Sequence, residues 1–221
     1  MDKTRISITI FCILLMACLA PQASSLYLRN FTFDDENALS KWKKMVLNGE
    51  VDYELLRNGQ NGFVKARSDK TCSALYNNVS FKLKNYPYMK WKWRVIRFPH
   101  LSRAEDDKER DDYPARVYVI FPFLTFSSSR FLEYVWATDL PAGTVLDSPY
   151  GKNVKIIVVR SGPQSKNEWC YESRNAYEDY KMAFGREPAN LVGAVAIMCD
   201  ADSTRSVAEA YFDTIEISKE R

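Results

Sequence analysis

Histidine is almost absent from this chain of 221 residues, in which His100 is the only one. A Ser-His-Asp or Cys-His catalytic centre would therefore need His100 itself, and a histidine-rich zinc or copper site is excluded. The sequence also lacks a glycine-rich phosphate loop and a dinucleotide-binding fingerprint. What remains for chemistry is the carboxylate, arginine and tyrosine side chains.

An excess of one charge is also missing, because 31 Lys and Arg residues face 28 Asp and Glu residues. Without a basic stripe, we expect no nucleic-acid binding. Low-complexity tracts and internal repeats are absent, and no segment after residue 17 is long and apolar enough to span a bilayer. Residues 26–221 suit one domain with a sizeable core, and we expect a monomer.

The N-terminal residues 1–25 have the pattern of a secretory signal peptide, with a short basic start followed by an apolar run over residues 6–17. Leu15-Met-Ala-Cys18 resembles the bacterial lipobox, which predicts cleavage before Cys18 and a lipid anchor on that cysteine. Cleavage after the small residues 23–25 is the alternative. The protein is therefore expected to be exported, either periplasmic or a membrane-anchored lipoprotein.

Three cysteines follow the signal peptide, Cys72, Cys170 and Cys199, and none belongs to a CxxC motif. One disulfide plus one spare thiol would fit an exported protein, but the spacing does not choose among the three pairings. Cys199 ends an apolar strand, and there we expect a buried, inert thiol.

Alternation of apolar and polar residues dominates the rest of the chain. Met89, Trp91, Trp93 and Val95 fall on one face of a strand whose other face is basic. Strands of this kind are expected at 28–33, 51–56, 62–67, 73–76, 79–83, 88–98, 116–123, 131–137, 154–160, 191–198 and 208–218. The pattern predicts an all-β fold, a two-sheet antiparallel β-sandwich of the jelly-roll, galactose-binding-like type.

One or two short helices are expected within this fold. Residues 174–184 have helical spacing and stop at Gly185, and residues 36–43 would form a helical turn capped by the aspartates before it. The charged connection 100–112 has few side chains to bury, so we read it as a solvated loop.

Three kinds of site compete for the polar clusters at the strand ends. Asp200 and Asp202, one residue apart after an apolar strand, would supply oxygen ligands for a structural Ca²⁺. Asp34, Asp35 or Asp213 would complete it. The competing interpretation is that these carboxylates cap turns or pair with arginines, and no other cofactor is expected.

Glycoside cleavage is the second hypothesis, since it needs two carboxylates at a defined separation. The catalytic candidates are Asp112 and Glu172, with Asp200 as a third carboxylate. Buried arginine–carboxylate pairs would leave the same residues in the sequence. The hydrolase and the structural interpretation therefore both stay open.

Carbohydrate binding is the third hypothesis, because a sugar ring offers a C–H face to an aromatic ring and hydroxyls to polar groups. The aromatic candidates are Trp91, Trp93, Trp136, Trp169 and Tyr118. Trp91 and Trp93 share the apolar face of their strand and are expected in the core. Tyr118 lies opposite Val117 and Val119, which makes it the better ligand candidate.

A family resemblance rests on several stretches taken together, which are 91–95, 111–119, 134–136, 172–175, 179–180, 194–198, 200–204 and 210–211. With these stretches the chain resembles the bacterial family known as domain of unknown function 3047. The matching polar positions are Arg94, Asp112, Tyr113, Arg116, Tyr118, Glu172, Arg174, Asn175, Asp200 and Asp202. The resemblance implies an exported single domain without an assigned activity. Residues 31–35 with Trp42, and residues 210–215, are also similar to the outer strands of galactose-binding-like jelly rolls.

These observations favour an exported β-sandwich that binds a carbohydrate or other envelope glycan without catalysis, through the first eight of those polar positions. A carboxylate-dependent carbohydrate-active enzyme is the alternative. A structural envelope lipoprotein without a ligand is the third.

Overall fold

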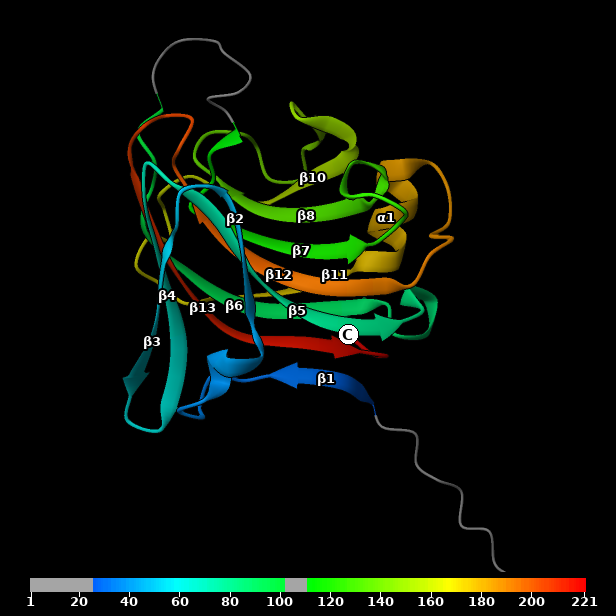
Figure 1. The fold of residues 1–221 in the computed structure, drawn as a ribbon, viewed down its shortest axis with the longest axis horizontal. Helices are drawn as coiled ribbons and strands as arrows, with labels where there is room; N and C mark the ends of the chain where they lie inside the picture. Colours follow the sequence, from blue (N-terminus) through cyan, green and yellow to red (C-terminus); the bar gives the residue numbers. More distant parts are fainter. Residues whose placement is uncertain (1–25, 102–110) are drawn as a thin grey trace, which may run out of the picture.

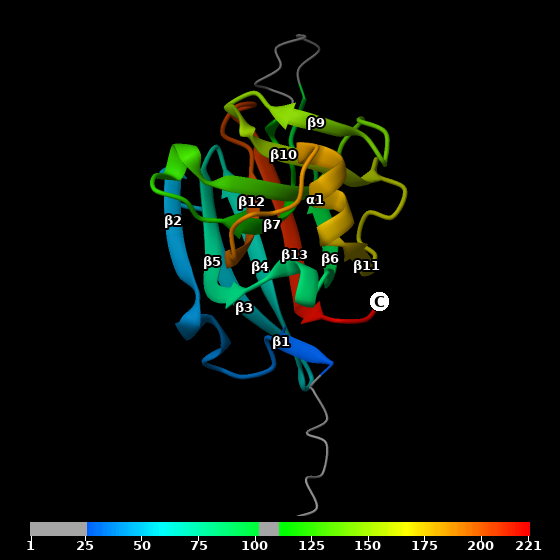
Figure 2. The same cartoon turned by 90° about the vertical axis from the view of Figure 1, so that its right-hand side faces the viewer.

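The computed structural model describes residues 26–101 and 111–221, which form two β-sheets packed face to face with one short helix at the end of the sandwich (Figures 1 and 2). The predicted signal peptide, with Cys18, and most of the charged connection 100–112 lie outside the described residues. Among the described residues, no helix has the length and apolar character needed to cross a membrane.

The first sheet has six strands in the order β11-β6-β13-β4-β3, and β1 pairs with the end of β13 that β4 leaves free. All its pairs are antiparallel. The strands are β1 (Tyr27–Phe31), β3 (Asp52–Asn58), β4 (Asn61–Asp69), β6 (Tyr88–Arg97), β11 (Cys170–Asn175) and β13 (Val207–Ser218). The first and last strands therefore lie side by side, as in the jelly-roll arrangement expected from the sequence.

The second sheet has seven strands in the order β2-β5-β12-β7-β8-β10-β9. They are β2 (Lys43–Asn48), β5 (Cys72–Phe81), β7 (Ala115–Phe121), β8 (Arg130–Ala137), β9 (Val145–Ser148), β10 (Gly151–Ser161) and β12 (Val192–Asp200). One pair departs from the antiparallel pattern, since β10 runs parallel to β8. The short β9 carries the chain back before β10 begins, and it pairs with the free edge of β10.

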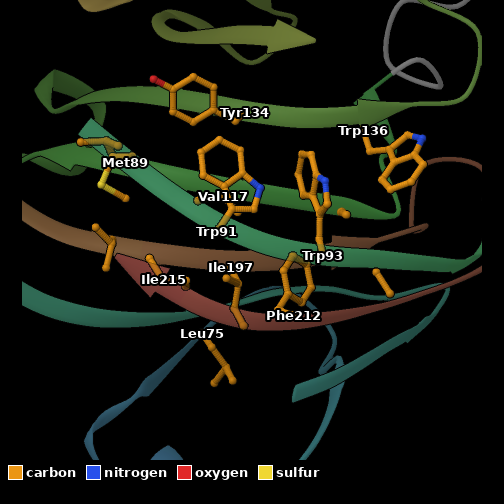
Figure 3. Close-up of a cluster of buried hydrophobic side chains, with 14 of the residues drawn as sticks. Leu75, Met89, Trp91, Trp93, Val117, Tyr134, Trp136, Ile197, Phe212 and Ile215 are labelled. Carbon is orange, nitrogen blue, oxygen red and sulfur yellow. The ribbon is translucent and has the colours of Figure 1, made fainter. Parts of the chain in front are cut away.

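The core lies between the two sheets and is rich in aromatic side chains (Figure 3). Trp91 contacts Trp93 edge to face at a ring separation of 5.4 Å, and it meets Tyr134 of the opposite sheet at 5.1 Å. Trp136 lies 5.9 Å from Trp93. The expectation that Trp91 and Trp93 belong to the core is confirmed, because neither is exposed.

The helix α1 (Ala176–Phe184) begins two residues later than expected, because β11 continues through Asn175. The Asn175 side chain accepts the backbone N–H of Glu178, which caps the first turn. Gly185 ends the helix in the left-handed conformation, at φ 67°. The turn expected at 36–43 is a 3₁₀ helix at Ala38–Lys41, and two more lie at Leu83–Asn85 and Phe126–Ser128.

Candidate functional site

A cleft of about 660 Å³ lies on the face of the seven-stranded sheet that points away from the core. Its floor comes from alternate residues of β5, β12, β7 and β8, whose neighbours in sequence face the core. Ala196, for example, sits between Tyr118 and Tyr76 in the strand register, while Val195 and Ile197 are buried in the core. We call this hollow the sheet cleft.

Arg116 of β7 forms the polar end of the sheet cleft, where one guanidinium faces three carboxyl groups. It donates from Nε and Nη2 to the two oxygens of Asp200, at 2.8 and 2.5 Å, and from Nη1 to Glu133 at 2.6 Å. Asp111 approaches Nη1 less closely, at 3.7 Å. All four side chains are buried, so the guanidinium compensates charges that water does not reach.

Asp111 is the least satisfied member of this cluster. Its Oδ1 is buried and has no hydrogen-bond partner among the described residues, although Asp111 lines the sheet cleft. Burial raises the pKa of Asp111 to about 8 and that of Asp200 to about 7, with Arg116 opposing the change in both. Because Asp111 is the more weakly paired of the two, it is the group that carries a proton near neutral pH.

The free energy of unfolding is therefore expected to fall as the pH rises from 5 to 9. The folded state retains protons on Asp111 and Asp200 that the unfolded chain releases near pH 4, so their contribution is present in acid and lost as the pH passes 7 to 8. Each group adds a slope of at most about 1.4 kcal/mol per pH unit. Urea unfolding at several pH values measures this dependence of the free energy of unfolding on pH.

Asp111→Asn is expected to remove the Asp111 part of this slope, whereas the matched change at the exposed Asp69 leaves the slope intact. A stability that increases steadily between pH 5 and 9 would contradict the assignment.

The loop that follows β12 closes the polar end of the sheet cleft. Asp112 accepts the backbone N–H groups of Ser203 and Thr204, at 3.3 and 2.6 Å, so it caps this loop. Asp202 accepts from the Asn48 side chain at 2.9 Å. Tyr113 supports the same end, since its N–H donates to Asp200 and its ring lies under the Arg116 guanidinium at 4.7 Å.

Possible metal ligands gather here, because ligand atoms of Cys72, Asp200 and Asp202 lie within 4.8 Å of one another. Both oxygens of Asp200 already bind Arg116, and a thiol is a poor ligand for Ca²⁺. Asp34 and Asp213, expected as further ligands, make contacts of their own, with the N–H of Gly62 and with Lys92. The calcium site stays a prediction.

All three cysteines in the described part of the chain are buried and free, so none of the three disulfide pairings forms in this structure. Burial raises the pKa of the Cys199 thiol, which keeps it protonated and unreactive, as expected from its position at the end of an apolar strand.

Glu172, Arg174 and Asn175 do not reach the sheet cleft, because β11 pairs with β6 in the six-stranded sheet. Glu172 accepts from the indole N–H of Trp93, at 3.1 Å, and from Nε of Arg160. Arg174 binds both oxygens of Asp179 at 2.6 and 2.9 Å. Asp112 and Glu172, the two catalytic candidates, therefore do not form a facing pair: each is engaged in a different part of the molecule.

Arg94 also lies away from the sheet cleft, on the outward face of the six-stranded sheet. Its guanidinium stacks against Tyr211 and Trp169, at 4.9 and 5.5 Å from the ring centres. Phe63 contacts both of these rings. Of the eight ligand-binding candidates, the structure thus gathers Arg116, Tyr118, Asp112 and Tyr113 at one place and disperses the other four.

Two residues of the cluster, Asp111 and Glu133, were not selected from the sequence. Glu133 lies in the middle of an apolar strand, between the core residues Leu132 and Tyr134. A lone charge at an alternate position of such a strand indicates a partner on the face of the sheet that points away from the core. Here the partner is Arg116 of β7, two residues before Tyr118, which pairs with Glu133 in the register. The lone Glu133 was visible in the sequence, but the pairing of β8 with β7 that identifies its partner was not.

The comparisons with known proteins place the chain in a family. The model described as "Protein of unknown function (DUF3047)" matches residues 40–216. The chain belongs to this family. The resemblance noted in the sequence is thereby confirmed, and a search of curated proteins found no match.

Solved structures with a similar arrangement of strands include carbohydrate-binding modules and glycanases. The family 30 carbohydrate-binding module of the Clostridium thermocellum cellulosomal cellulase Cel9D-Cel44B is 7% identical, with 81% of this chain and 92% of that chain covered and a TM-score of 0.45. The mannan-recognising module TmCBM27 is 11% identical, with 88% and 98% covered and a TM-score of 0.41.

The xyloglucanase domain of NopAA from Sinorhizobium fredii, in complex with cellobiose, is 12% identical, with 80% and 93% covered and a TM-score of 0.46. These distant similarities concern the jelly-roll β-sandwich alone. The chemistry of this chain has to be argued from its own residues.

Proposed function

We propose that this DUF3047 protein binds a glycan in the sheet cleft. The observation that carries the proposal is the buried Oδ1 of Asp111, which has no partner within residues 26–101 and 111–221 and lines the cleft beside the Arg116 cluster. A buried polar atom without a partner is costly unless a ligand satisfies it. Protonated Asp111 would donate to a sugar hydroxyl, and a free carboxylate oxygen would accept from one.

The aromatic rings near this cluster supply the second requirement of a sugar site. Tyr76 and Tyr118 flank Ala196 on the floor, and Tyr150 lines the same cleft from the turn before β10. A sugar ring placed over Ala196 would present its C–H face to these rings while its hydroxyls reach Asp111 and Asp202. The ligand would be met outside the cell or in the envelope, as the predicted signal peptide requires.

Tyr76→Ala and Asp111→Ala are each expected to weaken glycan binding about tenfold, since each removes about one stacking contact or one hydrogen bond. Binding is measured on a broad array of neutral and charged glycans, and the hits are then titrated by calorimetry. Tyr171→Ala is the matched control, because Tyr171 is exposed on the other sheet. Equal losses in all three variants, or no binding to any glycan, would overturn the proposal and favour a structural role.

Cleavage of the bound glycan is the second candidate function, and the raised pKa of Asp111 is what favours it. A carboxyl group with a pKa of about 8 is protonated at neutral pH, as a general acid must be, and Glu133 approaches the same guanidinium nitrogen. Product release from a glycan hit, lost in Asp111→Asn while binding remains, would support the enzyme.

A further inference from the structure

The sheet cleft changes character along its length. Next to the polar cluster lie Met198 and Ala74, which pair in the strand register. The next position holds Ala196 between Tyr76 and Tyr118, and the one after it holds Ala194 beside Ile120. Since residues 194 and 198 lie four positions apart on β12, this floor extends about 13 Å away from the charges.

The part of the sheet cleft farthest from Arg116 is mostly apolar, and its polar exceptions are Ser129 and Asn78, of which Asn78 pairs with Ala194 in the register. Ile120 pairs with Phe131, and Phe131 with Val154, so three apolar side chains continue the wall that Ala194 begins. The Ser129 hydroxyl already donates to the Thr125 carbonyl and accepts the N–H of Phe123. A sugar ring placed here would leave most of its hydroxyls without partners, which is unfavourable.

Two exposed apolar residues follow directly after the last residue of the apolar half, Pro122. Pro122 ends the floor, packed so closely on Gly193 that a Cβ there would lie 2.4 Å from its ring. Directly after it, Phe123 is 58% exposed and Leu124 87% exposed. Adjacent large apolar residues at such exposure, directly after a residue that lines a cleft, indicate a contact surface for an apolar ligand.

We infer that the glycan bound by this protein carries an alkyl or acyl chain, so that the ligand is a glycolipid. The sugar lies over Ala196 at the end with Asp111 and Arg116, and the chain lies over Ala194 and leaves past Pro122. This inference rests on the proposed function and deepens it. The small side chains of the floor leave room for a chain, and the apolar walls replace the water that would otherwise surround it.

The experiment uses maltosides with methyl, hexyl, octyl, decyl and dodecyl chains, each titrated below its micelle-forming concentration. Affinity is expected to rise about three- to fourfold per added methylene until the apolar half is filled. Ala194→Leu, which adds bulk to the floor, flattens the series. Ala142→Leu, the same change at an exposed turn, leaves it unchanged. A polyoxyethylene ether with a dodecyl chain, which lacks the sugar, binds at least tenfold more weakly than dodecyl maltoside.

The outcomes distinguish failure of the glycolipid inference from failure of the proposed glycan binding. A flat series in which methyl maltoside already binds fully overturns the glycolipid and leaves the glycan proposal standing. An ether that binds as tightly as dodecyl maltoside overturns both, because the sugar then contributes nothing. If no maltoside binds at any chain length, the glycolipid inference is overturned, and the glycan array decides the proposed function by itself.

Discussion

Arg116→Met is expected to destabilise the fold by about 3–5 kcal/mol at pH 7, the range measured when one partner of a buried ion pair is removed. The guanidinium is the only cation that the structure places against Asp200, Glu133 and Asp111 among the described side chains. Methionine preserves much of the length of the side chain, so the loss reports uncompensated charge rather than an empty space. Urea unfolding measures it.

Acid should restore part of this loss, because the three carboxyl groups then become neutral and no longer need the cation. The double variant Arg116→Met/Asp200→Asn is expected to lose less stability than the two single variants together, since Asp200→Asn removes a carboxylate that Arg116→Met leaves without its cation. Arg67→Met is the control for a surface pair, which is worth about 1 kcal/mol or less. A loss of that small size at Arg116 would refute the view that one guanidinium holds the cluster.

Trp91→Ala is the second change expected to have a large effect, a loss of about 3–5 kcal/mol in the free energy of unfolding. Trp91 is fully buried and joins the two sheets through its contact with Tyr134, while Trp93 of its own strand packs against it (Figure 3). Its removal leaves a cavity that the rigid sheets on either side do not fill. Thermal and urea unfolding both measure the loss.

Trp91→Phe is expected to cost much less, because the indole N–H of Trp91 has no hydrogen-bond partner to lose in the part of the chain that the structure describes. Trp169→Ala provides the exposed comparison, since Trp169 is 38% exposed and stacks on Arg94 at the surface. Similar losses for Trp91→Ala and Trp169→Ala would show that Trp91 does not join the sheets as described.

The sequence predicted those features of the fold that depend on alternation within one strand. It placed Trp91 and Trp93 in the core and Tyr118 on the opposite face of its strand, and the structure confirms both placements. It missed the edge strands β2 and β9 and the parallel pairing of β8 with β10. A four-residue strand has too few alternations to be recognised, and the direction of a pairing depends on the path of the connection.

The candidate site was predicted only in part, because a site depends on which strands become neighbours. Arg116 and Asp200 were selected as separate polar residues at strand ends, and the β7–β12 pairing brings them together. Glu172 and Arg174 occupy similar strand ends in the sequence, but β11 joins the other sheet. Glu133 was overlooked because its partner belongs to another strand.

The most direct test of a ligand in the sheet cleft is a titration followed through the methionine methyl groups. Met45 and Met198 line the cleft, Met89 is buried in the core, and Met182 is exposed on α1. With methionine labelled at its methyl carbon, dodecyl maltoside is expected to shift the NMR signals of Met45 and Met198 and to leave those of Met89 and Met182 unchanged. Shifts at Met182 alone, or none at Met45 and Met198 while calorimetry reports binding, would show that the ligand binds elsewhere.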